Sequence, residues 1–231
     1  MDYFGYSGLV LKVDLDRGKV ESETLSKELI EKFIGGWGIN LKLFRDWSKP
    51  LVDPLSPENP LILGAGPLVG TAVPGAVKLV ATTKSPIADR AGKHFIDCAV
   101  AGGKFGPMLK KAGYDHVIIT GRASEPVYLS IENKGAEILD ASDLWGKMDT
   151  YETTDWLLRR HPNAAVISIG KAGEKLVRYG MAIVDRFATL GRFGVGAVMG
   201  SKNLKAIAVR GDGGVRIAEP DEFLRWVREW R

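Results

Sequence analysis

The sequence contains one cysteine, Cys98, in 231 residues. The chain therefore cannot form an internal disulfide, and without a Cys-x-x-Cys pair it cannot hold an iron–sulfur cluster by the usual four thiolates. No apolar stretch approaches the roughly 20 residues of a membrane-spanning helix. The first residues lack the basic and apolar regions of a secretory signal. These absences favour a cytoplasmic protein with no membrane span.

A strong excess of one charge is also missing. Lys and Arg number 32 and Asp and Glu 28, for a formal net charge of +4. The basic residues are scattered along the chain, so the charge does not indicate nucleic-acid binding. The small surplus of positive charge fits a site for an anionic small molecule equally well. The hydrophobic fraction of 45% is that of an ordinary globular domain.

Alternation of apolar and polar residues predicts a hairpin over residues 9–20, with its turn at Asp16-Arg17-Gly18. Ser26 is placed to cap a helix that ends at Gly35-Gly36, and an apolar stripe predicts a second helix around Leu43. Asn133-Lys134-Gly135 is the turn signal of a second hairpin. Further strands are expected at 61–63, 77–82, 127–131, 136–139, 165–169 and 177–184, and a helix at 151–160.

An internal repeat is visible in the sequence. Residues 105–121 can be laid over residues 195–211 without a gap. Each copy then has the pattern of a glycine loop, a short helix, a left-handed stop (Gly113 or Asn203), a strand and a final glycine. Two unrelated glycine–helix–strand units are the alternative, because short apolar runs match easily.

Glycines gather just before each copy of the repeat. We define the first glycine loop as residues 101–106, the second as 191–196 and a third as 170–174. Glycine permits positive φ and a close approach of the backbone to a ligand, and helix starts favour anions. Lys104, Lys171 and Arg192 could add positive charge. Neither a P-loop nor a dinucleotide-binding fingerprint is present, and tight turns or close packing are the alternative use of these glycines.

Several segments, in their order along the chain, resemble the tungsten-containing aldehyde ferredoxin oxidoreductase family. Each segment alone is weak evidence, but their combination is highly specific and covers nearly the whole chain. The matching segments are 53–59, 66–71, 83–86, 102–106, 109–115, 140–147, 169–174 and 194–206.

The resemblance implies an α+β fold, with a β-rich domain of two intertwined pseudo-twofold repeats and a few short helices. This cofactor-binding domain would span residues 1–211, and residues 212–231 would be a linker and the start of a helical domain. In the family, the domain lies under tungsten or molybdenum held by two molybdopterin dithiolenes. Magnesium bridges the phosphates of the two pterins.

Site residues carry over from the family one at a time. Lys78 stands where the family has an arginine that contacts the cofactor; lysine keeps the charge but loses the bidentate fork. The backbone carbonyls of Val100 and Thr189 match the two that bind magnesium, and Arg192 matches a family arginine. The full set of implied cofactor-binding residues is Lys78, Ala101, Gly102, Gly103, Gly191, Arg192 and Gly194.

The sequence departs from the family around these positions. The link that precedes the first glycine loop is long and contains His94, Asp97 and Cys98. A helix would place His94 and Cys98 on one face, as a metal pair needs. Zinc binding, an active-site role for His94 and structural roles are the alternatives, so the catalytic residue is left open. His116 and His161 are expected to be structural.

Family members run far beyond this length, and their iron–sulfur cysteines and acid–base residues lie in later helical domains. We therefore expect a fragment, a truncated product or one subunit of a split enzyme, inactive by itself. Its partners would be those helical domains or a cysteine-rich subunit, with ferredoxin as electron acceptor; a homodimer is left open. The expected reaction is oxidation of an aldehyde to a carboxylic acid through a [4Fe–4S] cluster, or an acyl-CoA reductase-like reaction. A non-catalytic pterin-binding or structural subunit is the alternative.

Overall fold

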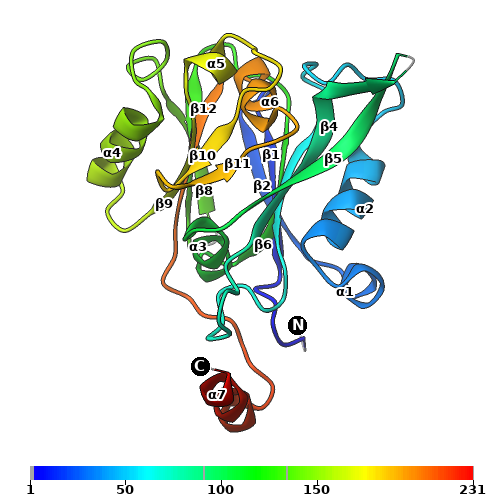
Figure 1. Cartoon of the computed structure of the whole chain (residues 1–231), viewed down its shortest axis with the longest axis vertical. Coiled ribbons are helices and arrows are strands. Elements are labelled where there is room, and N and C mark those ends of the chain that lie inside the picture. Colours follow the sequence, from blue (N-terminus) through cyan, green and yellow to red (C-terminus); the bar gives the residue numbers. More distant parts are fainter. Residues whose placement is uncertain (1–2, 91, 134, 231) are drawn as a thin grey trace.

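The computed structural model describes residues 3–90, 92–133 and 135–230. Two six-stranded sheets are present in this part of the chain, and their inner faces contribute to one hydrophobic core. Figure 1 shows helices α1 and α2 on one flank of the molecule and α4 on the opposite flank. Neighbouring strands run both parallel and antiparallel, so the fold belongs to the expected α+β class.

The first sheet is formed by the first half of the chain. Its strand order is β2-β1-β6-β3-β4-β5. The strands are β1 (Leu9–Asp14), β2 (Lys19–Thr24), β3 (Leu61–Ala65), β4 (Leu79–Arg90), β5 (Lys93–Ala101) and β6 (Tyr114–Thr120). The helices of this half are α1 (Lys27–Phe33), α2 (Trp37–Trp47) and α3 (Phe105–Lys111).

The second half of the chain forms the second sheet. Its order, read from the corresponding edge, is β8-β7-β12-β9-β10-β11. The strands are β7 (Val127–Glu132), β8 (Gly135–Asp140), β9 (Ala165–Ile169), β10 (Ala182–Val184), β11 (Ala188–Leu190) and β12 (Leu204–Arg210). The helices are α4 (Thr150–Arg160), α5 (Lys171–Glu174), α6 (Val195–Ser201) and, after a linker, α7 (Pro220–Glu229).

The predicted repeat is confirmed and extends to the whole sheet. Each strand of the first sheet has a counterpart at the same place in the second, and the central pairs β1–β6 and β7–β12 are both parallel. The predicted stops are left-handed, with φ of 98° at Gly113 and 56° at Asn203. The repeats are intertwined through their helices, because α3 lies against β9 and β12 while α6 lies against β4.

The outer helices cover the outer face of each sheet. Helix α1 begins where predicted, with the Ser26 hydroxyl accepting from the Leu29 amide at 3.2 Å, and α2 packs on β3 and β4. Helix α4 has a full capping box between Asp149 and Glu152, which fixes its first turn. It packs on β9, on the other sheet.

Two strand predictions need correction, and not every strand was predicted. The strand expected at 77–82 is β4, which begins at Leu79 and continues to Arg90. The expected strand at 177–184 is reduced to β10, because residues 175–180 form turns that include a positive φ at Leu176. Strand β11 has only three residues and was not predicted. In the hairpin signal 133–135, Lys134 lies outside the described residues, and β7 pairs with β8 across it.

Four lysines of the described residues are buried, and each ammonium donates to the backbone carbonyl of a connecting segment. Buried ammonium groups need such partners, since unpaired charge is costly away from water. The bonds run from Lys84 to Val52, from Lys110 to Gly5, from Lys202 to Pro57 and Gly121, and from Lys205 to Met148. The lysines therefore fasten loops to the sheets.

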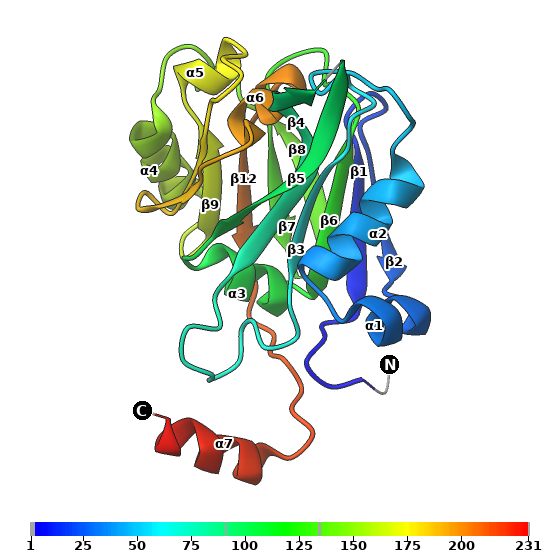
Figure 2. The ribbon, with the colours of Figure 1, turned by 45° about the vertical axis from the view of Figure 1, so that its right-hand side comes forward.

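The chain end lies apart from the sheets. Figure 2 shows α7 projecting below them at the end of the linker. The Gly5 amide donates to the Arg216 carbonyl at 2.8 Å, which ties the linker to the N-terminal segment. Within α7, Val227 is buried, whereas Trp226 and Trp230 are exposed. None of the helices in the described ranges is long and apolar enough to cross a membrane.

Candidate functional site

The two predicted glycine loops follow corresponding edge strands. Strand β5 is the outermost strand of the first sheet and β11 that of the second, and the two strands contact each other (Figure 1). The first glycine loop leads from β5 into α3, and the second leads from β11 into α6. We call β5, β11, these two loops and the residues that border the loops the seam. The repeat therefore brings the two loops to one region of the molecule.

Val100 and Thr189 occupy matching places on the seam. Val100 pairs with Val80 and Thr189 pairs with Ile183, in each case one rung from the end of the ladder. Both residues are exposed, and each lies on a strand whose outer edge has no strand partner within its own sheet. The two backbone carbonyls that the resemblance assigns to magnesium are thus equivalent positions of two touching strands.

The first glycine loop is open to solvent at Gly102. A Cβ on this residue would meet only the Lys78 ammonium, 3.9 Å away, so the structure brings Lys78 and Gly102 together. Gly103 has a φ of 97°. The Lys104 amide donates to Asp185 Oδ2 at 2.7 Å. One amide that was expected to be free for an anion is therefore already used by a carboxylate of the second repeat.

The second glycine loop combines strained backbone with tight packing. Phe193 and Gly194 have φ of 69° and 73°. A Cβ on Gly194 would lie 2.1 Å from the Arg178 carbonyl oxygen, and one on Gly191 would lie 3.0 Å from Thr189 Oγ1. Gly194 is therefore needed for packing, whatever it binds. Arg192 is exposed between these glycines.

The third glycine loop is a packing element in this structure. Residues 171–174 form the short helix α5. A Cβ on Gly173 would lie 2.8 Å from the Gly196 carbonyl oxygen, and one on Gly200 would lie 2.0 Å from the Gly173 carbonyl oxygen. These glycines let α5 and α6 pack closely, which was the alternative for glycine of this kind. Lys171 is exposed on α5.

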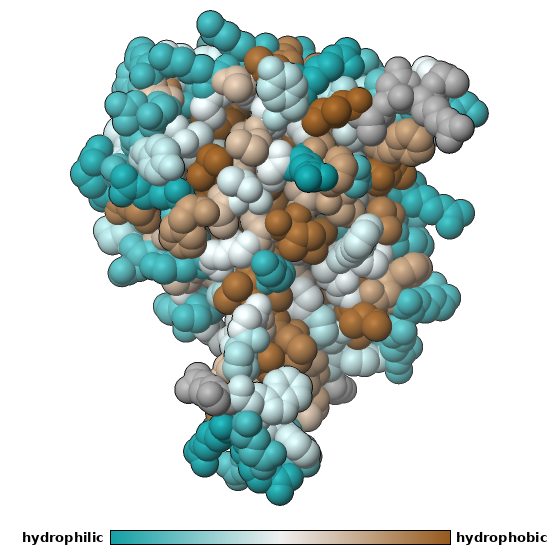
Figure 3. Space-filling model, in the orientation of Figure 1, coloured by the Kyte–Doolittle hydropathy of each residue, from teal (hydrophilic) through white to brown (hydrophobic). Residues whose placement is uncertain are grey.

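Positive charge without a counter-ion lies on the seam. Lys78, Lys104 and Arg192 are exposed, and none of them forms an ion pair in the part of the chain that the structure describes. Figure 3 shows apolar surface over the same face. Val100, Met181 and Phe187 are among its exposed apolar residues. The arrangement suits an anionic group that is then covered by apolar surface.

The predicted grouping of His94, Asp97 and Cys98 is wrong in its geometry. All three lie on β5 and not on a helix. Asp97 points to the opposite face from the other two, and His94 and Cys98 are separated by roughly 13 Å of extended chain. Among residues 3–90, 92–133 and 135–230, no three His, Cys, Asp or Glu side chains gather to hold a metal. Burial raises the pKa of the Cys98 thiol, which makes it a poor thiolate ligand.

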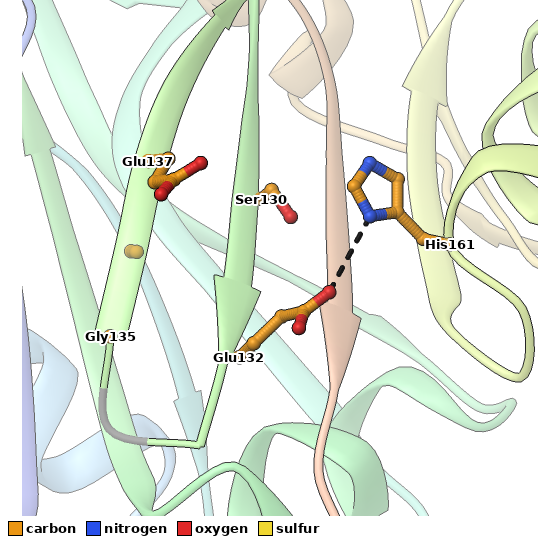
Figure 4. A pocket seen from close by; sticks show the side chains of 6 residues that line it. Ser130, Glu132, Gly135, Glu137 and His161 are labelled. Carbon is orange, nitrogen blue, oxygen red and sulfur yellow. Dashed lines mark ion pairs between the residues drawn. The ribbon is translucent and has the colours of Figure 1, made fainter.

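The other two histidines have structural contacts. His116 Nδ1 lies 2.8 Å from Asn40 Oδ1 in the core, and burial lowers the pKa of His116 to about 3. His161 lies between Tyr128 and Glu132, at 3.2 Å and 3.5 Å. It lines a hollow of about 360 Å³ with Ser130 and Glu137 (Figure 4). That hollow is at β7 and β8, the edge of the second sheet farthest from the seam.

Asp185 is the seam residue that the sequence did not reveal. It lies in the turn between β10 and β11, where Asp185 and Arg186 have φ of 50° and 73°. Consecutive left-handed residues other than glycine cannot be read from a sequence, because most such residues adopt negative φ. Its contact with Lys104 joins the two repeats.

Comparison with known proteins gives consistent matches. Residues 10–211 match the profile of the aldehyde ferredoxin oxidoreductase, N-terminal domain. The tungsten-containing aldehyde ferredoxin oxidoreductase of Pyrococcus furiosus is 43% identical over 98% of this chain and 37% of its own length. The aliphatic sulfonate oxidoreductase, WOR-like subunit, of the same organism is 38% identical over 91% of this chain and 35% of its own length.

A solved structure agrees with these sequences. The active site complex BamBC of benzoyl coenzyme A reductase, in complex with 1,5-dienoyl-CoA, superposes with a TM-score of 0.91 and 39% identity. The match covers 98% of this chain and 34% of that one. The chain therefore spans only about a third of the length of these proteins.

Proposed function

Because this chain belongs to the aldehyde ferredoxin oxidoreductase family and contains its N-terminal domain, we propose that it is the cofactor-binding part of a tungsten or molybdenum bis-pterin oxidoreductase. The observation that carries the proposal is the seam, where two repeats present equivalent edge strands, two glycine loops and unpaired cations at one place. The two pterins are related anionic ligands, and the two glycine loops would provide one related site for each.

The residues of the seam fit such a cofactor. Lys78, Gly102 and Gly103 on one side, and Gly191, Arg192 and Gly194 on the other, would hold the two pterins. Ala101, the buried last residue of β5, would fix where the first loop starts. Phosphate groups need cations and close-approaching backbone, and the open space at Gly102 beside the Lys78 ammonium supplies both.

Magnesium would lie between the two repeats. The Val100 and Thr189 carbonyls would bind it, and backbone oxygens are ligands that this hard cation accepts. Because the backbone does the binding, the side chains at these positions can vary. Magnesium would then offset the charge that the two phosphate groups bring together.

The chemistry of the complete enzyme would belong to the cofactor. When bound, it would accept two electrons as an aldehyde is oxidised to a carboxylic acid with oxygen from water, and pass them through a [4Fe–4S] cluster to ferredoxin. The residues of this chain would position the cofactor and neutralise its charge. No cluster ligand is expected from the chain itself, which has one cysteine.

The remaining parts of the enzyme would lie outside this chain. Residues 1–211 would be the cofactor domain, and residues 212–231, with α7, would be a linker and the start of a helical domain. The exposed Trp226 and Trp230 support this, because exposed aromatic residues on an amphipathic helix favour a covering domain. Further helical domains or a cysteine-rich subunit would complete the site, and a homodimer and a cytoplasmic location belong to the same proposal.

A non-catalytic subunit that binds pterin and docks on a catalytic chain is the second candidate. One relative is named as a subunit of an oxidoreductase, which supports a role within a larger assembly. Other relatives are named for aldehydes, aliphatic sulfonates and benzoyl coenzyme A, so an acyl-CoA reductase-like substrate is an alternative to an aldehyde. Co-purification of a cysteine-rich chain, and turnover of each substrate class, would separate these possibilities.

The test is to purify the chain anaerobically with whatever co-purifies, and to measure tungsten, molybdenum, magnesium and pterin per protein. We expect about two pterins per tungsten or molybdenum, as in cofactors of this type. K78A and R192A should each lower the pterin content several-fold, whereas K78R should retain it because arginine keeps the charge. K19A, at the opposite edge of the first sheet, is the matched control. Absence of metal and pterin from a folded preparation overturns the proposal.

A further inference from the structure

We propose that Asp185 is a positioning residue that holds the first glycine loop against the second repeat and thereby sets the two halves of the seam relative to each other. The inference rests on the proposed function for what the seam holds. Asp185 does not touch the cofactor in this proposal. It acts through the backbone of the loop.

Both oxygens of the Asp185 carboxylate are used. Oδ2 accepts from the Lys104 amide at 2.7 Å, and Oδ1 accepts from the Val166 amide at 2.9 Å. The Asp185 amide in turn donates to the Val166 carbonyl at 3.0 Å. One side chain therefore connects the first glycine loop to β9 of the second sheet, with its own position fixed by its backbone.

The first glycine loop is shaped to receive this carboxylate. A Cβ on Gly103 would lie 3.0 Å from Asp185 Oδ2 and 3.4 Å from a methyl group of Val184. Gly103 also has a φ of 97°, which side chains rarely adopt. The glycine thus serves the contact with the second repeat, in addition to any contact with a ligand.

The turn that carries Asp185 is strained, and it leads directly to the seam. Asp185 and Arg186 both have positive φ, and β11 with Thr189 follows. Strain of this kind persists only where the surroundings hold the backbone in place. The carboxylate thus ties the loop after Val100 to the turn before Thr189, the two residues whose carbonyls would share magnesium.

A carboxylate beside a site for phosphate groups opposes binding through its charge. The position of the Asp185 carboxylate is explained by the first glycine loop, which it holds. The Lys104 amide is engaged before any ligand arrives, which restricts the loop and keeps Gly102 beside Lys78. Pre-organised contacts of this kind reduce the entropy that is lost when a ligand binds.

The test compares D185A, D185N and the control D155N in the anaerobically purified protein with whatever co-purifies. Asp155 forms an exposed ion pair with Arg186 of the same turn, at 3.1 Å, so D155N removes a nearby charge and leaves the carboxylate contact intact. Two quantities are measured: amide hydrogen exchange of the segments that contain Lys104 and Val166, and the ratio of magnesium to pterin. A residue that only stabilised the fold would shift the thermal midpoint and leave that ratio unchanged.

We expect D185A to speed exchange at the Lys104 and Val166 amides by roughly tenfold to a hundredfold, the effect of losing hydrogen bonds to a charged acceptor. The magnesium-to-pterin ratio should fall several-fold. D185N keeps one acceptor oxygen and the shape of the side chain, so it should fold and show intermediate values. D155N should match the wild type in both measurements.

Two results overturn the inference. In the first, D185A and D185N exchange like the wild type. In the second, the loop is freed but the ratio of magnesium to pterin is normal. A wild-type preparation with neither metal nor pterin overturns the proposed function, and with it the claim that Asp185 affects cofactor binding. Amide exchange at Lys104 then still decides whether Asp185 holds the loop.

Discussion

The two repeats place opposite charges at the same irregularity of the sheet. In the first sheet, the register between β1 and β6 shifts at Asp115, and in the second, the register between β7 and β12 shifts at Lys205. Both side chains are buried, and each forms an ion pair: Asp115 with Lys110, and Lys205 with Glu174. Both repeats have this bulge, but its residue is an aspartate in the first repeat and a lysine in the second.

The difference shows what the buried charges are for. Asp115 accepts from the amides of Ser7 and Gly8, and so holds the N-terminal segment. Glu174, the partner of Lys205, accepts from the Gly146 amide and holds the segment before α4. Each repeat therefore uses its bulge to fasten a different connection. Backbone symmetry sets the position of the charge, and the segment that crosses there sets its sign.

The largest expected effect comes from breaking the ion pair of the first repeat. D115N leaves the Lys110 ammonium buried and without its counter-charge, and burial already lowers the pKa of Lys110. Removal of one partner of a buried pair costs about 3–5 kcal/mol. Urea unfolding should show a loss of this size in the free energy of unfolding.

The matched control is the double variant K110M/D115N. Because it removes both charges and keeps one acceptor oxygen for the Ser7 and Gly8 amides, it should recover part of the loss. A D115N protein within 1 kcal/mol of the wild type, by the same estimate, would show that the pair does not hold the N-terminal segment.

A smaller effect should separate the two glycine loops. G194A places a Cβ 2.1 Å from the Arg178 carbonyl oxygen at a φ of 73°, whereas a Cβ on Gly102 would meet only the Lys78 ammonium at 3.9 Å. Overpacking and backbone strain predict a loss of about 2–4 kcal/mol for G194A, and a change of less than about 1 kcal/mol for G102A. Equal losses in denaturant unfolding would contradict the packing role of Gly194.

The smallest effect is a dependence on pH that Lys202 should contribute in the second repeat. Lys202 is the residue that follows α6, and its counterpart after α3 is Ala112. Burial lowers the pKa of Lys202 from 10.5 to about 7. Between these values the unfolded chain binds more protons than the folded one, so the free energy of unfolding rises with pH, by at most about 1.4 kcal/mol per unit.

K202M should remove this slope, because methionine does not titrate. The measurement is urea unfolding at several pH values above 7, for the wild type, K202M and the exposed control K171M. Other groups titrate in this range, so the decisive quantity is the difference in slope between K202M and K171M. Identical slopes for the two variants would mean that Lys202 is charged throughout.

The sequence predicted the repeat because glycine, a helix and a left-handed stop recur at fixed spacing in both copies. The repeat depends on local patterns, which a sequence displays directly. Lys78 and Gly102 were assigned from the family resemblance, and the structure places the two residues close together. The assignment of cofactor contacts to these residues stays a prediction.

The errors share a physical cause, which is tertiary pairing that overrides local pattern. The segment around His94 was compatible with a helix, but pairing with β4 makes it a strand. Strand β11 has only three residues and owes its form to β10. The Asp185 contact joins residues far apart in the sequence, and no sequence pattern marks Asp185 as the partner of Lys104. Long-range contacts of this kind decide the detailed shape of the seam.

The division of the sheets along the chain has a consequence for synthesis on the ribosome. All strands of the first sheet have been made once residue 120 is reached, and all strands of the second come later. The first sheet can therefore pair before the second exists, but α3 also packs on β9 and β12. One face of the first sheet and of α3 therefore stays uncovered until the second half of the chain has been made. A pause in synthesis after the first half would expose this apolar surface to chaperones.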